Sequence, residues 1–145
     1  MDHLAIMNPK WHLIEKILAG EKTIESRWYA HKIAPWNKIT VGDTVYFKNS
    51  GKMVTAKATV QKFIQQELTS RNTAEELVRT YAEQICFNSE SLINLSWLEK
   101  KRYAMLIFIS NPELVTPFAI NKTGFGSACA WISIKSIKPL TIISS

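Results

Sequence analysis

Cysteine and histidine are scarce in this sequence. Cys86 and Cys129 are the only cysteines, and they lie far apart without the spacing of a metal site. This excludes a disulfide-rich scaffold and predicts two free thiols in a reducing compartment. The three histidines, at positions 3, 12 and 31, have no metal-ligand spacing, and none stands beside an obvious nucleophile. We therefore expect neither a metal ion nor another cofactor.

Long apolar runs are also missing. No stretch approaches the roughly 20 apolar residues that span a bilayer. The first residues lack the basic and then apolar pattern of a signal peptide. We therefore expect a cytoplasmic protein without a membrane partner. Its 145 residues, of which 46% are hydrophobic and 21% charged, are typical of one globular domain over residues 1–145.

Acidic side chains are sparse at both ends of the chain. Residues 1–63 hold 10 basic and 5 acidic side chains and residues 102–145 hold 4 and 1, whereas residues 64–101 hold 4 and 6. A surface built from the two ends would attract a polyanion such as RNA. The alternative is an ordinary lysine-rich surface that only keeps the protein soluble, and the net charge of +6 does not separate the two.

Local patterns predict an α+β fold. Asn8 and Pro9 resemble an N-cap and the first position of a helix over residues 10–19, which Gly20 ends. Four side chains share one face of that helix: Trp11, Ile14, Ile17 and Leu18. Alternation predicts strands over 23–29, 44–48 and 53–63, and a strongly apolar run predicts another over 103–110. Further strands are expected over 115–120, 128–134 and 139–143. Two helices, over 74–85 and 89–101, form an insertion between the basic halves, with Thr73 opening a capping signature. Such an order suits a curved or barrel-like sheet.

The segment over residues 20–27, Gly-Glu-Lys-Thr-Ile-Glu-Ser-Arg, places several charged side chains close together. It lies where the first predicted helix ends and a strand begins. Glu25 and Arg27 share a strand face, with Cβ atoms about 7 Å apart. An arginine grips a phosphate or base edge, and Lys22 can neutralise a phosphate. A glutamate accepts hydrogen bonds from an exocyclic amine or a sugar hydroxyl, or acts as a general base. The alternative is a surface ion pair between Glu25 and Arg27.

The G-x-K-x-x-E-x-R pattern, followed about 15 residues later by the Gly42-Asp43 turn and the strand at Thr44, resembles an ASCH domain of the PUA-like superfamily. The segment from Lys122 to Trp131 is similar to the closing strand of the microbial single-domain members. This resemblance covers nearly the whole chain. It implies a PUA-like curved β-barrel, a basic cleft lined by the motif, and a role in RNA binding or RNA-linked chemistry.

Two reactions are known among such domains. Some small bacterial members are amidohydrolases of acetylated cytidine and use a lysine, a threonine and a glutamate. Lys22 matches the lysine, but Glu25 stands at the threonine position, so the proposed nucleophile is missing. Other members are described as ribonucleases with a tyrosine, a lysine and a serine, for which Tyr46, Lys52 and Ser127 are counterparts by placement.

Metal-free RNA cleavage needs a base for the ribose 2′-hydroxyl and a cation for the phosphorane. Tyr46 or Glu25 would serve as the base, and Lys22, Lys52 or Arg27 would supply the cation. The alternative for Tyr46 is a strand aromatic packed on the core.

Aromatic side chains form the second group of candidates. Trp11 and Trp97 are expected in the core, because each lies on an amphipathic helix. Trp28 follows Arg27, and Trp36 lies in a loop beside Lys38. Aromatic side chains beside basic ones are the usual means of stacking an unpaired base. Phe125, between two glycines, would present its ring or nearby backbone amides.

The sequence therefore predicts a small RNA- or nucleotide-binding domain, with single-stranded or modified RNA, or nucleotides, as partners. The expected binding residues are Lys22, Glu25, Arg27, Trp28, Trp36, Lys48, Lys52, Lys122 and Phe125. A metal-independent ribonuclease or modified-nucleoside hydrolase using the same cleft is the enzymatic alternative. A protein-interaction module with an acidic partner is the third.

Overall fold

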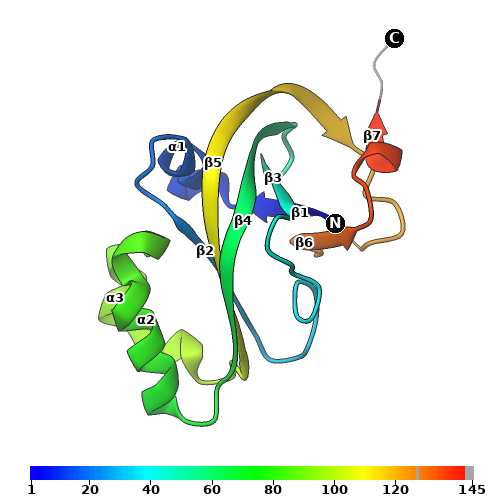
Figure 1. Cartoon of the computed structure of the whole chain (residues 1–145). Coiled ribbons are helices and arrows are strands. Elements are labelled where there is room, and N and C mark those ends of the chain that lie inside the picture. Colours follow the sequence, from blue (N-terminus) through cyan, green and yellow to red (C-terminus); the bar gives the residue numbers. More distant parts are fainter. Residues whose placement is uncertain (127, 143–145) are drawn as a thin grey trace.

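The computed structural model describes residues 1–126 and 128–142, and its centre is a strongly curved mixed sheet (Figure 1). The strand order is β2-β5-β4-β3-β1-β6, with β7 paired to β5. The strands are β1 (Asp2–Met7), β2 (Ile24–Tyr29), β3 (Thr44–Asn49), β4 (Val54–Glu67), β5 (Tyr103–Ile120), β6 (Trp131–Ile134) and β7 (Thr141–Ile142). The helices are α1 (Leu13–Leu18), α2 (Arg71–Ile85) and α3 (Ser89–Ile93), and the 3-10 turns are η1 (Pro9–Trp11), η2 (Leu95–Leu98) and η3 (Lys138–Leu140).

Strands β3 and β4 form the predicted hairpin. Gly51 has a φ of 77°, and the Lys52 amide donates to the Asn49 carbonyl at 3.0 Å, which closes the turn. The prediction of two strands over 103–110 and 115–120 is wrong, because β5 runs unbroken between them. Its pairing with β4 shifts register at several points. Such bulges add twist and bend a long strand pair, so β4 and β5 curve with the sheet (Figure 1).

Strand β1 was not predicted, although it holds the centre of one half of the sheet. It pairs parallel with β3 and antiparallel with β6. Its continuous run of small and apolar side chains lacks alternation because Leu4 and Ala5 are both buried, on opposite faces. A short run of this kind is typical of a strand covered on both faces.

The predicted helix over 10–19 is broken near its start. Asn8 caps η1 as expected, its side chain accepting from the Lys10 amide at 3.0 Å. His12 then adopts a left-handed conformation, with φ 52°, and α1 begins after it. Because of this break, the Trp11 side chain does not lie on the same face as the buried Ile14 and Ile17. The prediction of Trp11 as a core residue is therefore wrong, because 48% of it is exposed.

The helical insertion lies between β4 and β5, as predicted. Helix α2 begins at Arg71, with Ser70 as N-cap, rather than after Thr73. The predicted helix over 89–101 is shorter and is split into α3 and η2. The insertion packs on β2 and β5 through a core of its own, which includes Ile24, Val78 and Leu106. None of the helices in the described part of the chain is long and apolar enough to cross a membrane.

The Gly42-Asp43 turn is held by a buried polar network. His3 Nε2 lies 2.8 Å from Asp43 Oδ2, and its Nδ1 lies 2.8 Å from Ser133 Oγ. The indole of Trp131 donates to the same Nδ1 at 3.3 Å, so Nδ1 is an acceptor and the proton belongs on Nε2. Asp43 also accepts from the Thr40 amide at 2.9 Å. The network joins β1, β6 and the turn before β3.

Acid is expected to unfold the protein through this network. Burial lowers the pKa of His3 below its ordinary value despite Asp43. The unfolded chain therefore takes up a proton first, so stability falls as pH drops below about 6.5 toward the folded-state pKa. Burial acts to raise the pKa of Asp43, but hydrogen bonds from His3, the Thr40 amide and the N-terminus together lower it. That adds a further loss of stability below about pH 4.

Thermal unfolding of His3→Gln should be measured from pH 8 to 5, with the exposed-residue variant His31→Gln as the control. The unfolding temperature of His3→Gln should depend less on pH than that of the control. Equal slopes would contradict this account.

Candidate functional site

The segment over residues 20–27 leads from α1 into β2. Gly20, with a φ of 79°, lets the chain reverse after α1. The Glu21 and Lys22 amides then donate to the Lys16 carbonyl. The turn therefore holds the start of β2 against α1 and brings Lys22 beneath the last turn of α2.

Lys22 is buried, with 2% of its surface exposed. Its ammonium donates to the Ile24 carbonyl at 2.8 Å and to the Ile85 carbonyl at 2.6 Å, and lies 3.6 Å from Glu25 Oε1. Burial lowers its pKa, and the nearby Glu25 opposes that shift. The ammonium therefore makes two hydrogen bonds to carbonyls and an ion pair with Glu25. Lys22 ties β2 to the C-terminus of α2 and holds Glu25, so its charge is already used within the protein.

Arg27 closes the seam of the curved sheet. It reaches from β2, at one end of the strand order, to the Ala130 carbonyl at 3.1 Å and the Ile6 carbonyl at 3.4 Å, beside the other end. Its guanidinium also lies 5.1 Å from the centre of the Trp131 ring. Its Nη2 is 3.7 Å from Glu25 Oε2. The side chain therefore acts in the folded protein as a clamp between strands and as the second cation beside Glu25.

The Glu25 carboxylate lies between these two cations and is 4% exposed. Oε1 accepts the Ser26 amide at 3.0 Å. Oε2 is buried and has no hydrogen-bond partner among the described residues. Leaving such an acceptor unpaired costs about 1–3 kcal/mol, and more for a charged group. The ion pair between Glu25 and Arg27, which was the alternative drawn from the sequence, does form, but it is buried rather than on a solvated surface, and Glu25 also lines a pocket.

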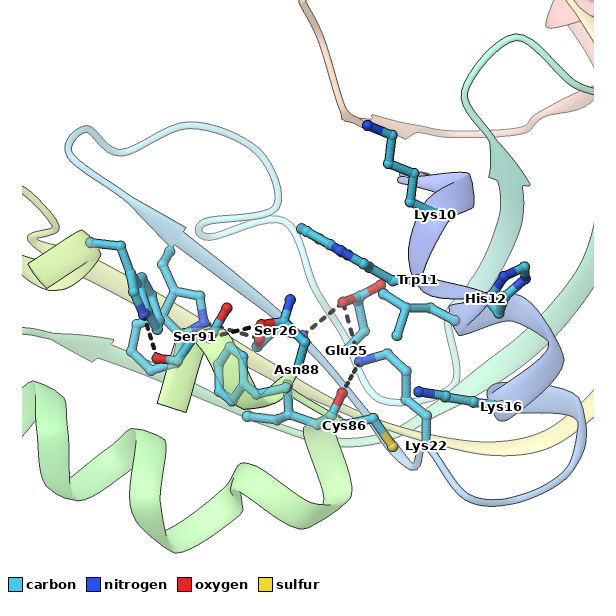
Figure 2. Close-up of a pocket in the computed structure, with 15 residues that line it drawn as sticks. Lys10, Trp11, His12, Lys16, Lys22, Glu25, Ser26, Cys86, Asn88 and Ser91 are labelled. Atoms are coloured by element: carbon cyan, nitrogen blue, oxygen red, sulfur yellow. Dashed lines mark hydrogen bonds and ion pairs between the residues drawn. The ribbon is translucent and has the colours of Figure 1, made fainter. Parts of the chain in front are cut away.

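That pocket has a volume of about 630 Å³ (Figure 2). In the view of Figure 2 the Glu25 carboxylate lies between the Trp11 ring and the Lys22 ammonium. Aromatic rings form much of the wall. Trp28 and Trp97 meet edge to face, with centroids 5.5 Å apart, and Phe87 packs on both. Lys10 and Lys16 stand at the rim, and the lining also includes His12, Leu13, Ser26, Ile85, Cys86, Asn88 and Ser91.

The other predicted site residues are spread over the molecule. Trp36 packs on the core edge to face with Tyr103, and Tyr46 packs in the same way on Phe118. Lys52 and Phe125 are exposed in turns, Lys48 is buried, and Lys122 donates to the Cys129 carbonyl at 2.9 Å. Ser127 lies outside the described residues. The structure thus gathers Lys22, Glu25, Arg27 and Trp28 around one pocket system and places Trp36, Tyr46 and Lys52 elsewhere.

Several lining residues were not predicted from sequence. Lys10, Trp11 and Lys16 come from η1 and α1, and Phe87 and Asn88 come from the loop after α2. The only signal for the first group was an aromatic side chain between two lysines at the start of the chain. Cys86 and Cys129 are free thiols, and no cluster of metal-ligating side chains occurs within residues 1–126 and 128–142.

No protein-family model matches the chain, and no curated protein matches it in sequence. Solved structures do resemble it. The ASCH protein from Zymomonas mobilis has a TM-score of 0.67 at 13% identity, covering 97% of this chain and 96% of that one. A single-site variant of that protein has a TM-score of 0.68 at 12% identity, covering 95% and 93%. The N-terminal domain of McrB from Staphylothermus marinus has a TM-score of 0.54 at 11% identity, covering 92% and 87%.

Similarity at this level of identity establishes the fold. The match to the Zymomonas mobilis protein and its variant extends over nearly the full length of both chains. The resemblance drawn from residues 20–27 and the Gly42-Asp43 turn is confirmed at the level of the fold. The chain therefore has the same fold as the ASCH protein from Zymomonas mobilis, an α+β fold built on a curved sheet.

Proposed function

We propose that this protein binds single-stranded RNA or a nucleotide by taking one unpaired base into the pocket beside Glu25. The observation that carries the proposal is the Glu25 Oε2 atom, which is buried without a hydrogen-bond partner among the described residues, on a side chain that lines the pocket. An amino or ring N–H of a base would supply the missing donor. Binding then removes the cost of an unpaired buried acceptor and adds a charge-assisted hydrogen bond.

The local charges favour a neutral donor over a cation. Glu25 already has Lys22 at 3.6 Å and Arg27 at 3.7 Å, so the cluster of three carries a net positive charge. A cationic ligand would meet that charge and the rim lysines Lys10 and Lys16. A nucleotide whose base enters the pocket and whose phosphate remains at the rim suits these charges. The base donates to Glu25, and the phosphate lies near the rim lysines.

The walls suit a flat ring. Trp11 is exposed for 48% of its surface and lines the pocket, so a base can stack on it without displacing core packing. Stacking of a base on an aromatic side chain contributes about 1–3 kcal/mol and requires the base to be unpaired. This favours single-stranded over duplex RNA.

The test is the binding of short single-stranded RNAs and nucleoside 5′-monophosphates, followed by tryptophan fluorescence and amide chemical shifts. Glu25→Gln should weaken binding at least about tenfold, or about 1.4 kcal/mol. The amide oxygen of the glutamine is needed at the Oε1 position to accept from the Ser26 amide and to face the Lys22 ammonium. Its NH₂ group then occupies the Oε2 position and opposes a donor on the base.

Glu21→Gln is the matched control, since it removes an exposed carboxylate from the same turn and should leave affinity unchanged. Equal affinity for wild type and Glu25→Gln, or chemical-shift changes confined to residues away from the pocket, would refute the proposal.

Deoxyribose versions of the same oligonucleotides separate RNA from DNA binding. Product formation would instead support the alternative of a ribonuclease or modified-nucleoside hydrolase. Binding is the better-supported function, because the Lys22 ammonium donates to two carbonyls and forms an ion pair with Glu25.

A further inference from the structure

The pocket beside Glu25 is also lined by a side-chain amide, that of Asn88. Among the described residues that line it, Glu25 is the one carboxylate and Asn88 the one carboxamide. Figure 2 shows both side chains at this pocket, Glu25 from β2 and Asn88 from the loop after α2. Glu25 offers a ligand an acceptor, its buried and unpaired Oε2 atom. The amide of Asn88 is a second polar group within the same pocket.

The Asn88 amide has a fixed orientation. Asn88 is the N-cap of α3, and its side-chain oxygen accepts from the Ser91 backbone amide at 2.8 Å. A backbone N–H only donates, so the side-chain atom that faces it is the oxygen. The NH₂ group has no hydrogen-bond partner among the described residues, and it is not among their buried unpaired atoms. The cap therefore leaves Asn88 with a free, accessible donor.

The segment that carries Asn88 is held in place on both sides. The ring of the preceding residue, Phe87, packs on Trp28 and Trp97, with centroids 6.3 and 5.5 Å away. The Asn88 carbonyl accepts from the Leu92 amide at 3.3 Å. A donor that is already ordered loses little conformational entropy when a ligand binds, which favours both affinity and specificity.

One acceptor and one donor in the same pocket match a base edge that carries a donor beside an acceptor. The amino group and adjacent ring nitrogen of adenine or cytosine form such an edge, and so do the ring N–H and carbonyl of uracil. Guanine adds a second donor, because its ring N–H and amino group are neighbours. The second oxygen of Glu25 is already used, since Oε1 accepts the Ser26 amide at 3.0 Å and lies 3.6 Å from the Lys22 ammonium. A buried guanine would therefore keep one donor unpaired, which is unfavourable.

We propose that Asn88 is a second base-binding residue, whose NH₂ group donates to an acceptor of the base while Glu25 Oε2 accepts from the neighbouring donor. This inference rests on the proposed function of the pocket. It narrows the ligand to nucleotides of adenine, cytosine or uracil and excludes guanine. The bound base then joins β2 to the helical insertion, because the two side chains come from these two parts of the fold.

The experiment titrates the four nucleoside 5′-monophosphates into the full chain and into Asn88→Asp. Aspartate is as good an N-cap as asparagine, so it keeps the bond to the Ser91 amide and places an acceptor where the donor stood. Wild type should bind GMP at least about tenfold more weakly than its preferred monophosphate, because a donor of guanine stays unpaired. Asn88→Asp should weaken binding of the preferred monophosphate at least about tenfold, because an acceptor then faces an acceptor.

Asn94→Asp is the matched control. Asn94 caps η2 in the same way, with its side-chain oxygen accepting from the Ser96 amide at 3.0 Å, but it is exposed and does not line the pocket. This variant adds the same charge and should leave the affinity unchanged. Asn88→Ser also keeps an N-cap but removes the amide without adding a charge, and it should weaken binding about threefold to tenfold. Thermal unfolding of each variant checks that the cap is retained.

The inference is overturned if Asn88→Asp binds as tightly as Asn94→Asp, or if GMP binds as tightly as any other monophosphate. Weaker binding by Glu25→Gln with unchanged binding by Asn88→Asp and Asn88→Ser would refute the role of Asn88 and keep the pocket. Unchanged binding by Glu25→Gln, or no binding of any nucleotide by wild type, would refute the proposed function of the pocket and this inference with it.

Discussion

Lys22→Met is expected to destabilise the protein by about 3–5 kcal/mol. The substitution keeps most of the side-chain volume but leaves the Ile24 and Ile85 carbonyls without their donor. It also leaves the buried Glu25 with only Arg27, at 3.7 Å, as a neighbouring cation. Breaking a buried pair costs more than the pair contributes, because the remaining charge stays desolvated. Denaturant unfolding followed by circular dichroism measures the loss of stability.

The double variant Lys22→Met/Glu25→Leu separates stability from function. Replacing both members of a buried ion pair with apolar side chains is often neutral, so most of the lost stability should return. RNA binding should not return, because the acceptor for the base is gone. Lys57→Met is the matched control from an exposed pair with Glu113, and it should cost less than about 1 kcal/mol. A double variant as unstable as Lys22→Met would show that the two carbonyls, and not the stranded carboxylate, dominate the loss of stability.

Trp11→Ala should weaken RNA binding with little change in stability, whereas Trp28→Ala should lower the stability of the fold. Trp11 is half exposed, so its removal should leave the unfolding free energy nearly unchanged and weaken RNA binding by about 1–3 kcal/mol, or roughly tenfold to a hundredfold. Trp28 is 9% exposed and packs on Phe87 and Trp97, so its removal should destabilise the fold by about 3–5 kcal/mol. Unfolding curves and RNA titrations of both variants provide the measurements. Unchanged affinity in Trp11→Ala would remove stacking from the binding account.

Predictions from the sequence succeeded where short-range geometry decides. The alternation over residues 23–29 correctly placed Glu25 and Arg27 on one face of β2. The turn at Gly51 correctly joined β3 to β4. Predictions failed where a single residue interrupts a pattern. His12 splits the first helix, and Asn111, with φ 51°, bends β5 without ending it. Hydrophobic periodicity does not register such single-residue backbone changes, since it averages over a window.

The sequence by itself determined the α+β class, the hairpin and the position of the insertion, and it predicted residues 20–27 as the candidate site. Only the tertiary structure decided what those residues do. The Ile85 carbonyl that holds Lys22 lies 63 positions away, and the Ala130 carbonyl that holds Arg27 lies 103 positions away. Local spacing sets the face on which a side chain points, but its partners come from distant strands and helices. That is why two expected phosphate ligands, Lys22 and Arg27, instead donate to protein carbonyls and flank Glu25, whose Oε2 atom has no hydrogen-bond partner among the described residues.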